Sequence, residues 1–268
     1  MTSKTISPNI LTSSGKLDSR AKPDGSAKMT VIRSDQFVNG YSPSFYAALD
    51  QSSDYCSNFY GTLGGRLVHA VDIKYNINDQ TNAHLSMNLL GYYKELYIDY
   101  DLFIPANYYK TGTANNKLIR IWRDNYIDSA SGLGQHVGAS MWTSSVGDGS
   151  GKLRCDCAME QVIDGTWSTS SRGTTDDLFI PIAEAGSWVH ITVYVRVPTH
   201  AGDVSKNVGD GIIRIFKNGV VSCEITDLHT VGAGPQEFGN MYLMGWANAA
   251  YAEETHFYVT KLVLRGIQ

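Results

Sequence analysis

The sequence predicts an all-β protein in which two antiparallel sheets pack face to face. Short segments alternate apolar and polar residues, and clusters of Gly, Asn, Asp and Ser separate them. The chain of 268 residues contains 26 Gly and 16 Tyr, which favours turns and strands over helices. No segment shows the apolar spacing of an amphipathic helix. Two packed sheets are the simplest arrangement that buries one face of every strand.

Composition and charge exclude several classes of partner. The net charge is −4, and Lys and Arg form no basic stripe, so we expect no nucleic acid partner. No apolar run is long enough to enter and cross a membrane, so we expect no membrane insertion. The first residues lack the apolar segment of a signal peptide, so the chain is predicted to be made as a soluble protein. A role outside a cell would then require lysis or assembly into a larger particle.

The first 27 residues differ in composition from the rest. They are rich in Ser, Thr, Lys, Gly and Pro and show little periodicity. Such a segment is predicted to be a flexible, extended arm or tether that becomes ordered only when it docks on something. Residues 28–268 are predicted to form the folded domain.

Each strand is predicted from its alternation and from the turn residues on either side of it. The pair Asn218-Gly219 supplies the positive φ angles of a type I′ turn, which predicts a tight hairpin between two late strands. In chain order, the predicted strands are residues 28–33, 66–74, 83–90, 95–103, 117–124, 135–142, 152–161, 187–197, 211–218, 220–225, 241–247 and 256–264.

The segment SWVHITVYVRV at 187–197 shows the alternation most clearly. Every second residue from Val189 to Val197 is aliphatic, whereas the residues between them are aromatic, basic or hydroxylated. Side chains alternate between the two faces of a strand. One face of this strand is therefore predicted to be core, and the other carries Trp188, His190 and Tyr194.

The four cysteines are predicted to be reduced thiols in the core. Cys155 and Cys157 lie on the same side of one predicted strand, whereas Cys56 and Cys223 are distant in sequence. A zinc site would need further ligands at a fixed spacing, and none is present. Calcium was considered for the acidic loops at 124–128 and 203–210, but neither fits an EF-hand. No metal or cofactor is therefore predicted.

The order of several segments resembles the concanavalin A-like lectin/glucanase superfamily, especially its polysaccharide-lyase and viral surface-protein branches. The segments are ELYIDYDLFIP, KLIRIW, SWVHITVYVRV, DGIIRIFKNGVVSCEI and THFYVTKLVLR. In this superfamily a Trp-led strand precedes a D-G…N-G hairpin, matched here by Trp188, Asp210-Gly211 and Asn218-Gly219. The resemblance implies a jelly roll in which one sheet curves into a groove that binds or cleaves glycans.

Sorting the other strands by alternation predicts a single groove lined by aromatic and polar side chains. Aromatic rings stack on sugars, and carboxylates, Arg and His bond to hydroxyls, so these residues are predicted to bind a ligand. A solvated outer face or a protein-docking face would have a similar composition. The predicted ligand-binding residues are Tyr97, Asp99, Asp101, Arg120, Trp122, His136, Trp142, Arg154, Asp156, Glu160, Trp188, His190, Tyr194 and Arg196.

Two kinds of glycan cleavage are compatible with the residue types on these faces. Asp99 and Asp101 share a strand face, but ELYIDYD does not reproduce the Glu-x-Asp-x-x-Glu pattern of the related glucanases. β-Elimination on a uronate needs a base, an acid and a cation. If the protein is a lyase, these roles are predicted for His190, Tyr194, Arg196 and Lys117. Against a lyase, the segment AHLSMNLL has His84, Ser86 and Asn88 where one lyase family has Arg-x-Glu-x-Arg.

The sequence therefore predicts a non-catalytic protein that binds a poly- or oligosaccharide or attaches to a surface. The arm and the missing signal peptide resemble virion decoration or tail components, in which residues 1–27 would dock on a neighbouring subunit. A polysaccharide lyase acting on an acidic glycan is the first alternative, and a purely structural virion protein is the second. Homo-oligomerisation is left open.

Overall fold

The computed structural model describes most of the chain after the N-terminal segment. The described residues are 29–40, 55–78, 84–108, 117–123, 136–145, 153–163, 166–174, 179–199, 210–228, 237–245, 247 and 250–268. Strands dominate these residues, with one short 3-10 helix, η3 (Ile182–Glu184). Within the same ranges, no helix has the length and apolar character needed to span a bilayer.

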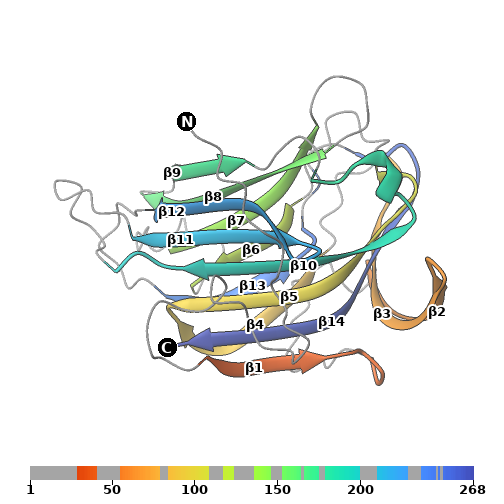
Figure 1. Cartoon of the computed structure of the whole chain (residues 1–268), viewed down its shortest axis with the longest axis horizontal. Helices are drawn as coiled ribbons and strands as arrows, with labels where there is room; N and C mark the ends of the chain where they lie inside the picture. The colour runs from red at the N-terminus through yellow and green to blue at the C-terminus, as the bar shows by residue number, and fades with distance from the viewer. Residues whose placement is uncertain are drawn as a thin grey trace.

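The strands form two antiparallel sheets that lie one behind the other (Figure 1). The first sheet has eight strands in the order β12-β11-β10-β5-β14-β3-β2, and β1 also pairs with β14. Their bounds are β1 (Thr30–Asp35), β2 (Cys56–Leu63), β3 (Arg66–Tyr75), β5 (Glu95–Ile104), β10 (Ser187–Arg196), β11 (Gly211–Lys217), β12 (Val220–Leu228) and β14 (Thr255–Ile267).

The second sheet has six strands in the order β4-β13-β6-β7-β8-β9. Their bounds are β4 (Leu85–Tyr93), β6 (Lys117–Trp122), β7 (His136–Ser145), β8 (Leu153–Ile163), β9 (Thr166–Thr174) and β13 (Phe238–Leu243). The expected sandwich of antiparallel sheets is therefore confirmed.

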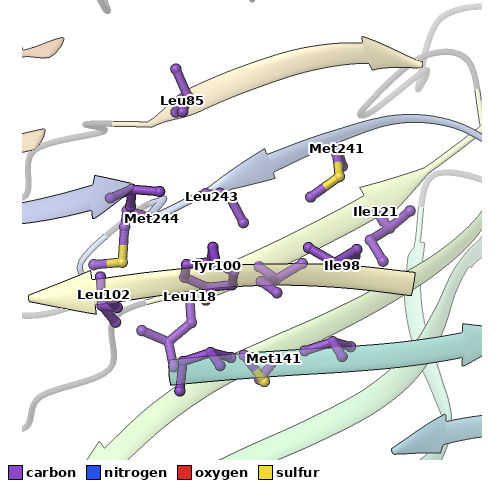
Figure 2. Close-up of a cluster of buried hydrophobic side chains, with 14 of the residues drawn as sticks. Leu85, Ile98, Tyr100, Leu102, Leu118, Ile121, Met141, Met241, Leu243 and Met244 are labelled. Carbon is purple, nitrogen blue, oxygen red and sulfur yellow. The ribbon is translucent and has the colours of Figure 1, made fainter. Parts of the chain in front are cut away.

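The core lies between the two sheets. Alternate residues of β5, such as Ile98, Tyr100 and Leu102, are fully buried and face Met241 and Leu243 of β13 (Figure 2). The aliphatic face of β10 joins the same core, as its alternation predicts. Burial of this apolar surface is the main favourable free energy of the fold.

Local sequence explains the hairpin turn between β11 and β12, and a register shift explains an irregularity in β6. Asn218 and Gly219 have φ angles of 49° and 79°, which confirms the predicted type I′ hairpin between β11 and β12. In β6 the register shifts between Lys117 and Ile119, and Leu118 and Ile119 both enter the core. A β-bulge of this kind lets two consecutive residues face the same side.

The hairpin of β2 and β3 is strongly curved and lies at one end of the eight-stranded sheet (Figure 1). The indole of Trp188 donates a hydrogen bond of 3.0 Å to the carbonyl of Leu63 at the hairpin turn. Trp188 belongs to β10, three strands away from β3 in the sheet order. Further from the turn, the hydroxyl of Thr260 in β14 donates a hydrogen bond of 2.7 Å to the carbonyl of His69 in β3. The base of this hairpin therefore extends the sheet through the pairing of β3 with β14, whereas its turn contacts Trp188 of β10; we call the hairpin the arch (residues 56–75).

Truncation of a side chain between the sheets should be far more costly than truncation at the surface. Ile191 is fully buried in the core, whereas Val220 is about half exposed. We expect Ile191→Ala to lower the free energy of unfolding by about 2–5 kcal/mol and Val220→Ala by less than about 1 kcal/mol. Urea unfolding of the two variants measures the difference. Equal losses would contradict the placement of the core.

Candidate functional site

The predicted single groove is wrong, because its residues belong to two different sheets. Strands β5 and β10 lie in the eight-stranded sheet, whereas β6, β7 and β8 lie in the six-stranded sheet. The core separates the two sets, so their polar side chains face opposite outer surfaces. Alternation distinguishes the core side of a strand from its outer side, but it does not tell which sheet the strand joins.

The structure places nine of the fourteen predicted ligand-binding side chains. Seven lie on the outer face of the eight-stranded sheet: Tyr97, Asp99, Asp101, Trp188, His190, Tyr194 and Arg196. Two lie on the outer face of the six-stranded sheet: Arg120 and Trp122. The side chains of the other five, in β7 and β8, lie outside the described part of the structure; these are His136, Trp142, Arg154, Asp156 and Glu160. Residues 1–27, 124–128 and 203–209 also lie outside it. Their predicted roles remain predictions.

On the eight-stranded sheet, His190 is held between two carboxylates. Its Nδ1 lies 2.8 Å from Oδ1 of Asp101, and its Nε2 lies 3.2 Å from Oδ2 of Asp99. Thr192 and the hydroxyl of Tyr97 each donate a further bond of 3.0 Å to Asp99. Strand register explains the arrangement, because His190 is directly opposite Asp101 and Thr192 is directly opposite Asp99.

Asp101 joins four strands through one carboxylate. Besides His190 of β10, it contacts Arg66 of β3 and Lys261 of β14, each at 3.0 Å. Lys261 lies at a bulge in β14, where its φ is 52°, and its side chain extends to Asp101. Arg66 is part of the arch, and its guanidinium also lies 5.1 Å from the ring centroid of Trp188. The carboxylate of Asp101 therefore fastens the arch to the sheet.

The charges of this network are fixed near neutral pH. Hydrogen bonds to Asp101 and Asp99 outweigh burial and raise the pKa of His190 to about 9. Burial would raise the pKa of Asp101, but bonds from His190, Lys261 and Arg66 outweigh it and hold that pKa well below its usual range. In these charge states His190 cannot act as a general base and Asp101 cannot act as a general acid. The network ties neighbouring strands together through charged hydrogen bonds.

The predicted lyase residues do not form a catalytic group. Tyr194 is fully buried and donates a bond of 2.6 Å to Glu95. Arg196 donates to the carbonyl of Asp210. Lys117 begins β6 in the other sheet. Grouping Lys117 with His190 was wrong, because sequence alternation does not assign strands to sheets. Tyr194 and Arg196 do share β10 with His190, but each is bonded to a group outside the His190 network.

Tyr97 is covered by other side chains on the outer face. It is 2% exposed and forms a small apolar cluster with Phe216, against which Met29 and Val221 pack. Met29 is the first described residue, so the chain enters the described fold across this outer face. This part of the face is covered, unlike the neighbourhood of His190.

On the six-stranded sheet, a row of side chains crosses three adjacent strands. Ser86 of β4 is directly opposite Tyr242 of β13, which is directly opposite Arg120 of β6. The Tyr242 ring lies between two others, with centroids 5.5 Å from His84 and 5.7 Å from Trp122. We call Ser86, Tyr242, Arg120, His84 and Trp122 the arginine row.

The arginine row is buried although it lies outside the core. Its members are between 2% and 6% exposed. The hydroxyl of Ser86 has no hydrogen-bond partner among the described residues. Exposure increases along the face, since Asn88 is exposed and Tyr92, with Arg123 at 4.6 Å from its ring centroid, is 44% exposed. The row is therefore a partly dehydrated polar site close to an exposed aromatic surface.

Sequence reasoning selected only Arg120 and Trp122 from this row. His84 and Ser86 were noted as departures from a lyase pattern, and Tyr242 was placed in a strand without a role. Alternation in β4 and β13 could have identified all three as outward-facing. Their proximity to Arg120 could not be found this way, because β4 and β6 are joined only through β13, which is far away in sequence.

No metal site is found within the described ranges. No group of three or more His, Cys, Asp or Glu residues there is placed to hold an ion.

No family model and no curated protein matches the sequence. Solved structures do match. An endo-β-1,4-glucuronan lyase from the fungus Trichoderma reesei aligns at a TM-score of 0.58 and 11% identity over 88% of this chain and 94% of that one. The fold is that of the concanavalin A-like jelly rolls.

Two further jelly rolls of different activity align over similar lengths. The marine PL-14 alginate lyase from Aplysia kurodai gives a TM-score of 0.56 and 13% identity over 88% of this chain and 98% of that one. A glycoside hydrolase family 16 endo-glucanase from Bacteroides ovatus gives 0.51 and 10% identity over 87% and 98%. The predicted superfamily resemblance is confirmed for the fold. At these identities the likeness carries no activity to this chain.

The raised pKa of His190 predicts a loss of stability in alkali. The contribution of its ion pairs is fully present below pH 6.5 and disappears as pH rises through about 9. Because the side chain is 30% exposed, we expect solvent to reduce the contribution to on the order of 1–2 kcal/mol. Between about pH 6.5 and pH 10, wild type should lose that much more unfolding free energy than His190→Gln. His69→Gln is the matched control and should behave as wild type; an unchanged slope in His190→Gln would contradict the prediction.

Removing the charge of Asp101 should loosen the arch. Asp101→Asn leaves His190, Arg66 and Lys261 without their shared carboxylate, and we expect a cost of about 3 kcal/mol. Hydrogen exchange should increase first at the amides of the arch, residues 56–75. The matched control is Glu224→Gln, which breaks the more exposed pair with Arg214 and should cost less than about 1 kcal/mol. Uniform exchange across the sheet would contradict the fastening role.

Proposed function

We propose that the protein binds an acidic polysaccharide through the arginine row on the outer face of the six-stranded sheet. The observation that carries the proposal is the position of Arg120, directly opposite Tyr242, whose ring lies between those of His84 and Trp122. A guanidinium can bind a carboxylate through two parallel hydrogen bonds. A uronate sugar offers such a carboxylate together with an apolar ring face for stacking on aromatic side chains.

The unpartnered hydroxyl of Ser86 supports the same site. Ser86 is 95% buried and directly opposite Tyr242, so its hydroxyl lies within the arginine row. Burying a hydroxyl without a partner is unfavourable, and a polar group of a sugar that extends from Arg120 across Tyr242 would satisfy it. The rise in exposure toward Asn88 and Tyr92 gives a sugar chain a solvent-accessible side from which to approach.

The structural neighbours support a carbohydrate ligand without identifying one. They include an endo-β-1,4-glucuronan lyase and an alginate lyase, which act on acidic chains, and an endo-glucanase. The acidic class is favoured for this protein because Arg120 is central to the row.

Cleavage by β-elimination is the second candidate, and one observation favours it. The Tyr242 ring lies 5.5 Å from that of His84, and Tyr242 is directly opposite Arg120, so a base, an acid and a cation occur at three adjacent strands. Incubation with alginate and with polyglucuronate, followed by the absorbance of the unsaturated product, tests this. Product that disappears in His84→Gln and Tyr242→Phe would establish a lyase. No product, with binding retained, would leave recognition as the function.

Binding should require the guanidinium of Arg120 and not positive charge alone. We expect Arg120→Lys to weaken binding of uronate oligosaccharides at least about tenfold, or about 1.4 kcal/mol, because lysine cannot form the bidentate contact. Arg214→Lys, on the opposite sheet, is the matched control. Calorimetric titration with oligoalginate, oligoglucuronate and a neutral β-glucan measures both effects. Equal affinity for the neutral glucan would overturn the proposal.

Ser86→Ala gives a second, independent measurement. Because the hydroxyl is unpartnered among the described residues, its removal should not lower the unfolding free energy. The same change should weaken uronate binding about threefold to tenfold, which is one charge-assisted hydrogen bond. A loss of stability with unchanged binding would show that the hydroxyl serves the fold.

The virion setting, the docking of residues 1–27 and self-association remain predictions from the sequence. They are separate from the glycan proposal, and none of the experiments above depends on them.

A further inference from the structure

Two buried thiols lie against each other between the sheets. The Sγ atoms of Cys157 and Cys223 are 3.5 Å apart, and the two residues are 0% and 6% exposed. Cys157 belongs to β8 of the six-stranded sheet, and Cys223 belongs to β12 of the eight-stranded sheet. The contact therefore joins the two layers of the sandwich. Neither residue is in a disulfide in the structure.

We propose that Cys157 and Cys223 form an inter-sheet disulfide when the protein meets an oxidising environment. A disulfide has an S–S length of about 2.05 Å, so the sulfurs must approach by about 1.5 Å. Side-chain rotation and small shifts at a sheet edge supply movements of this size. Cys56, the other described cysteine, bonds instead to the carbonyl of His84. Burial raises the pKa of its thiol to about 12, so it is poorly reactive.

The position of Cys223 gives an oxidant a route to the pair. Strand β12 ends the order of the eight-stranded sheet, so it is hydrogen-bonded to one neighbour, β11, within that sheet. Edge strands open locally at a lower free energy than central ones. Cys223, the more exposed of the two thiols, is therefore the residue that reacts first, and Cys157 completes the bond.

The reaction is a thiol–disulfide exchange with a small disulfide such as oxidised glutathione. The Cys223 thiolate attacks one sulfur of the oxidant and forms a mixed disulfide, while the other half leaves as a thiolate. Cys157, after losing its proton, attacks Sγ of Cys223 and displaces the second half. Two protein thiols are oxidised by two electrons, and one small disulfide is reduced to two thiols.

The cross-link should raise the melting temperature. It closes a long loop between residues 157 and 223, which reduces the entropy of the unfolded chain. For a chain of this size we expect a rise of roughly 5–10 °C. The reduced protein serves as its own reference, because dithiothreitol should reverse the shift.

Alkylation counting tests whether the bond forms. The chain has four cysteines, so the reduced protein, denatured and treated with N-ethylmaleimide, should gain four adducts by intact mass. After oxidised glutathione it should gain two adducts and show no glutathione mass. Four adducts, or glutathione retained on the protein, would overturn the proposal.

Peptide mapping identifies the partners without any variant. Cleavage on the amino side of aspartate separates Cys155 from Cys157 at Asp156, and it places Cys223 in the peptide that begins at Asp210. The proposal predicts a linked pair of residues 156–163 with 210–226. A link from Cys155 to Cys223 would refute it. As matched variants, Cys155→Ala should keep the cross-link and the rise in melting temperature, whereas Cys157→Ala should lose both.

Discussion

The two outer faces of this protein exist because one apolar layer separates them. Residues such as Ile98, Tyr100 and Ile191 from one sheet meet Met241 and Leu243 from the other, and they are excluded from water. A strand that gives one face to this layer must give its other face to one outer surface only. Polar groups on β5 and β10 therefore cannot cooperate directly with those on β6 and β13. A binding or catalytic site must therefore be built from residues of one outer face.

The two faces differ in whether their polar groups already have hydrogen-bond partners within the protein. Around His190 each carboxylate already accepts hydrogen bonds from neighbouring strands, and these bonds hold the arch against the sheet. Around Arg120 the polar groups lie among aromatic rings, and the Ser86 hydroxyl has no partner in the described part of the structure. The first arrangement resembles a fastening, and the second resembles a site prepared for a polar ligand.

The fold could be predicted because its determinants are local. Alternation identified the core faces of β5 and β10, and Asn218-Gly219 identified the hairpin. Two strands were missed, β2 and β9, because CSNFYGTL and TWSTSSRGT contain too few apolar residues to show alternation. Edge strands with little buried surface give weak signals of this kind.

The site could be predicted only in part, because its determinants are not local. Arg120 and Trp122 were correctly placed on the outer side of their strand, yet they were grouped with His190. The contacts of Arg120 depend on β13 lying between β4 and β6, although β13 comes more than a hundred residues later in the chain. Topology of this kind follows from the packing of the whole chain, and a strand's own residues do not contain it.

Lys261 combines an unfavourable backbone with a favourable charge. Its positive φ is a conformation that glycine or asparagine adopts more easily, yet only a cation there can reach Asp101. Chain geometry and electrostatics thus favour different amino acids at one position. Among related proteins, a lysine or arginine at this position would indicate that the ion pair with Asp101 is kept, whereas glycine or asparagine would indicate that the relaxed backbone has replaced it.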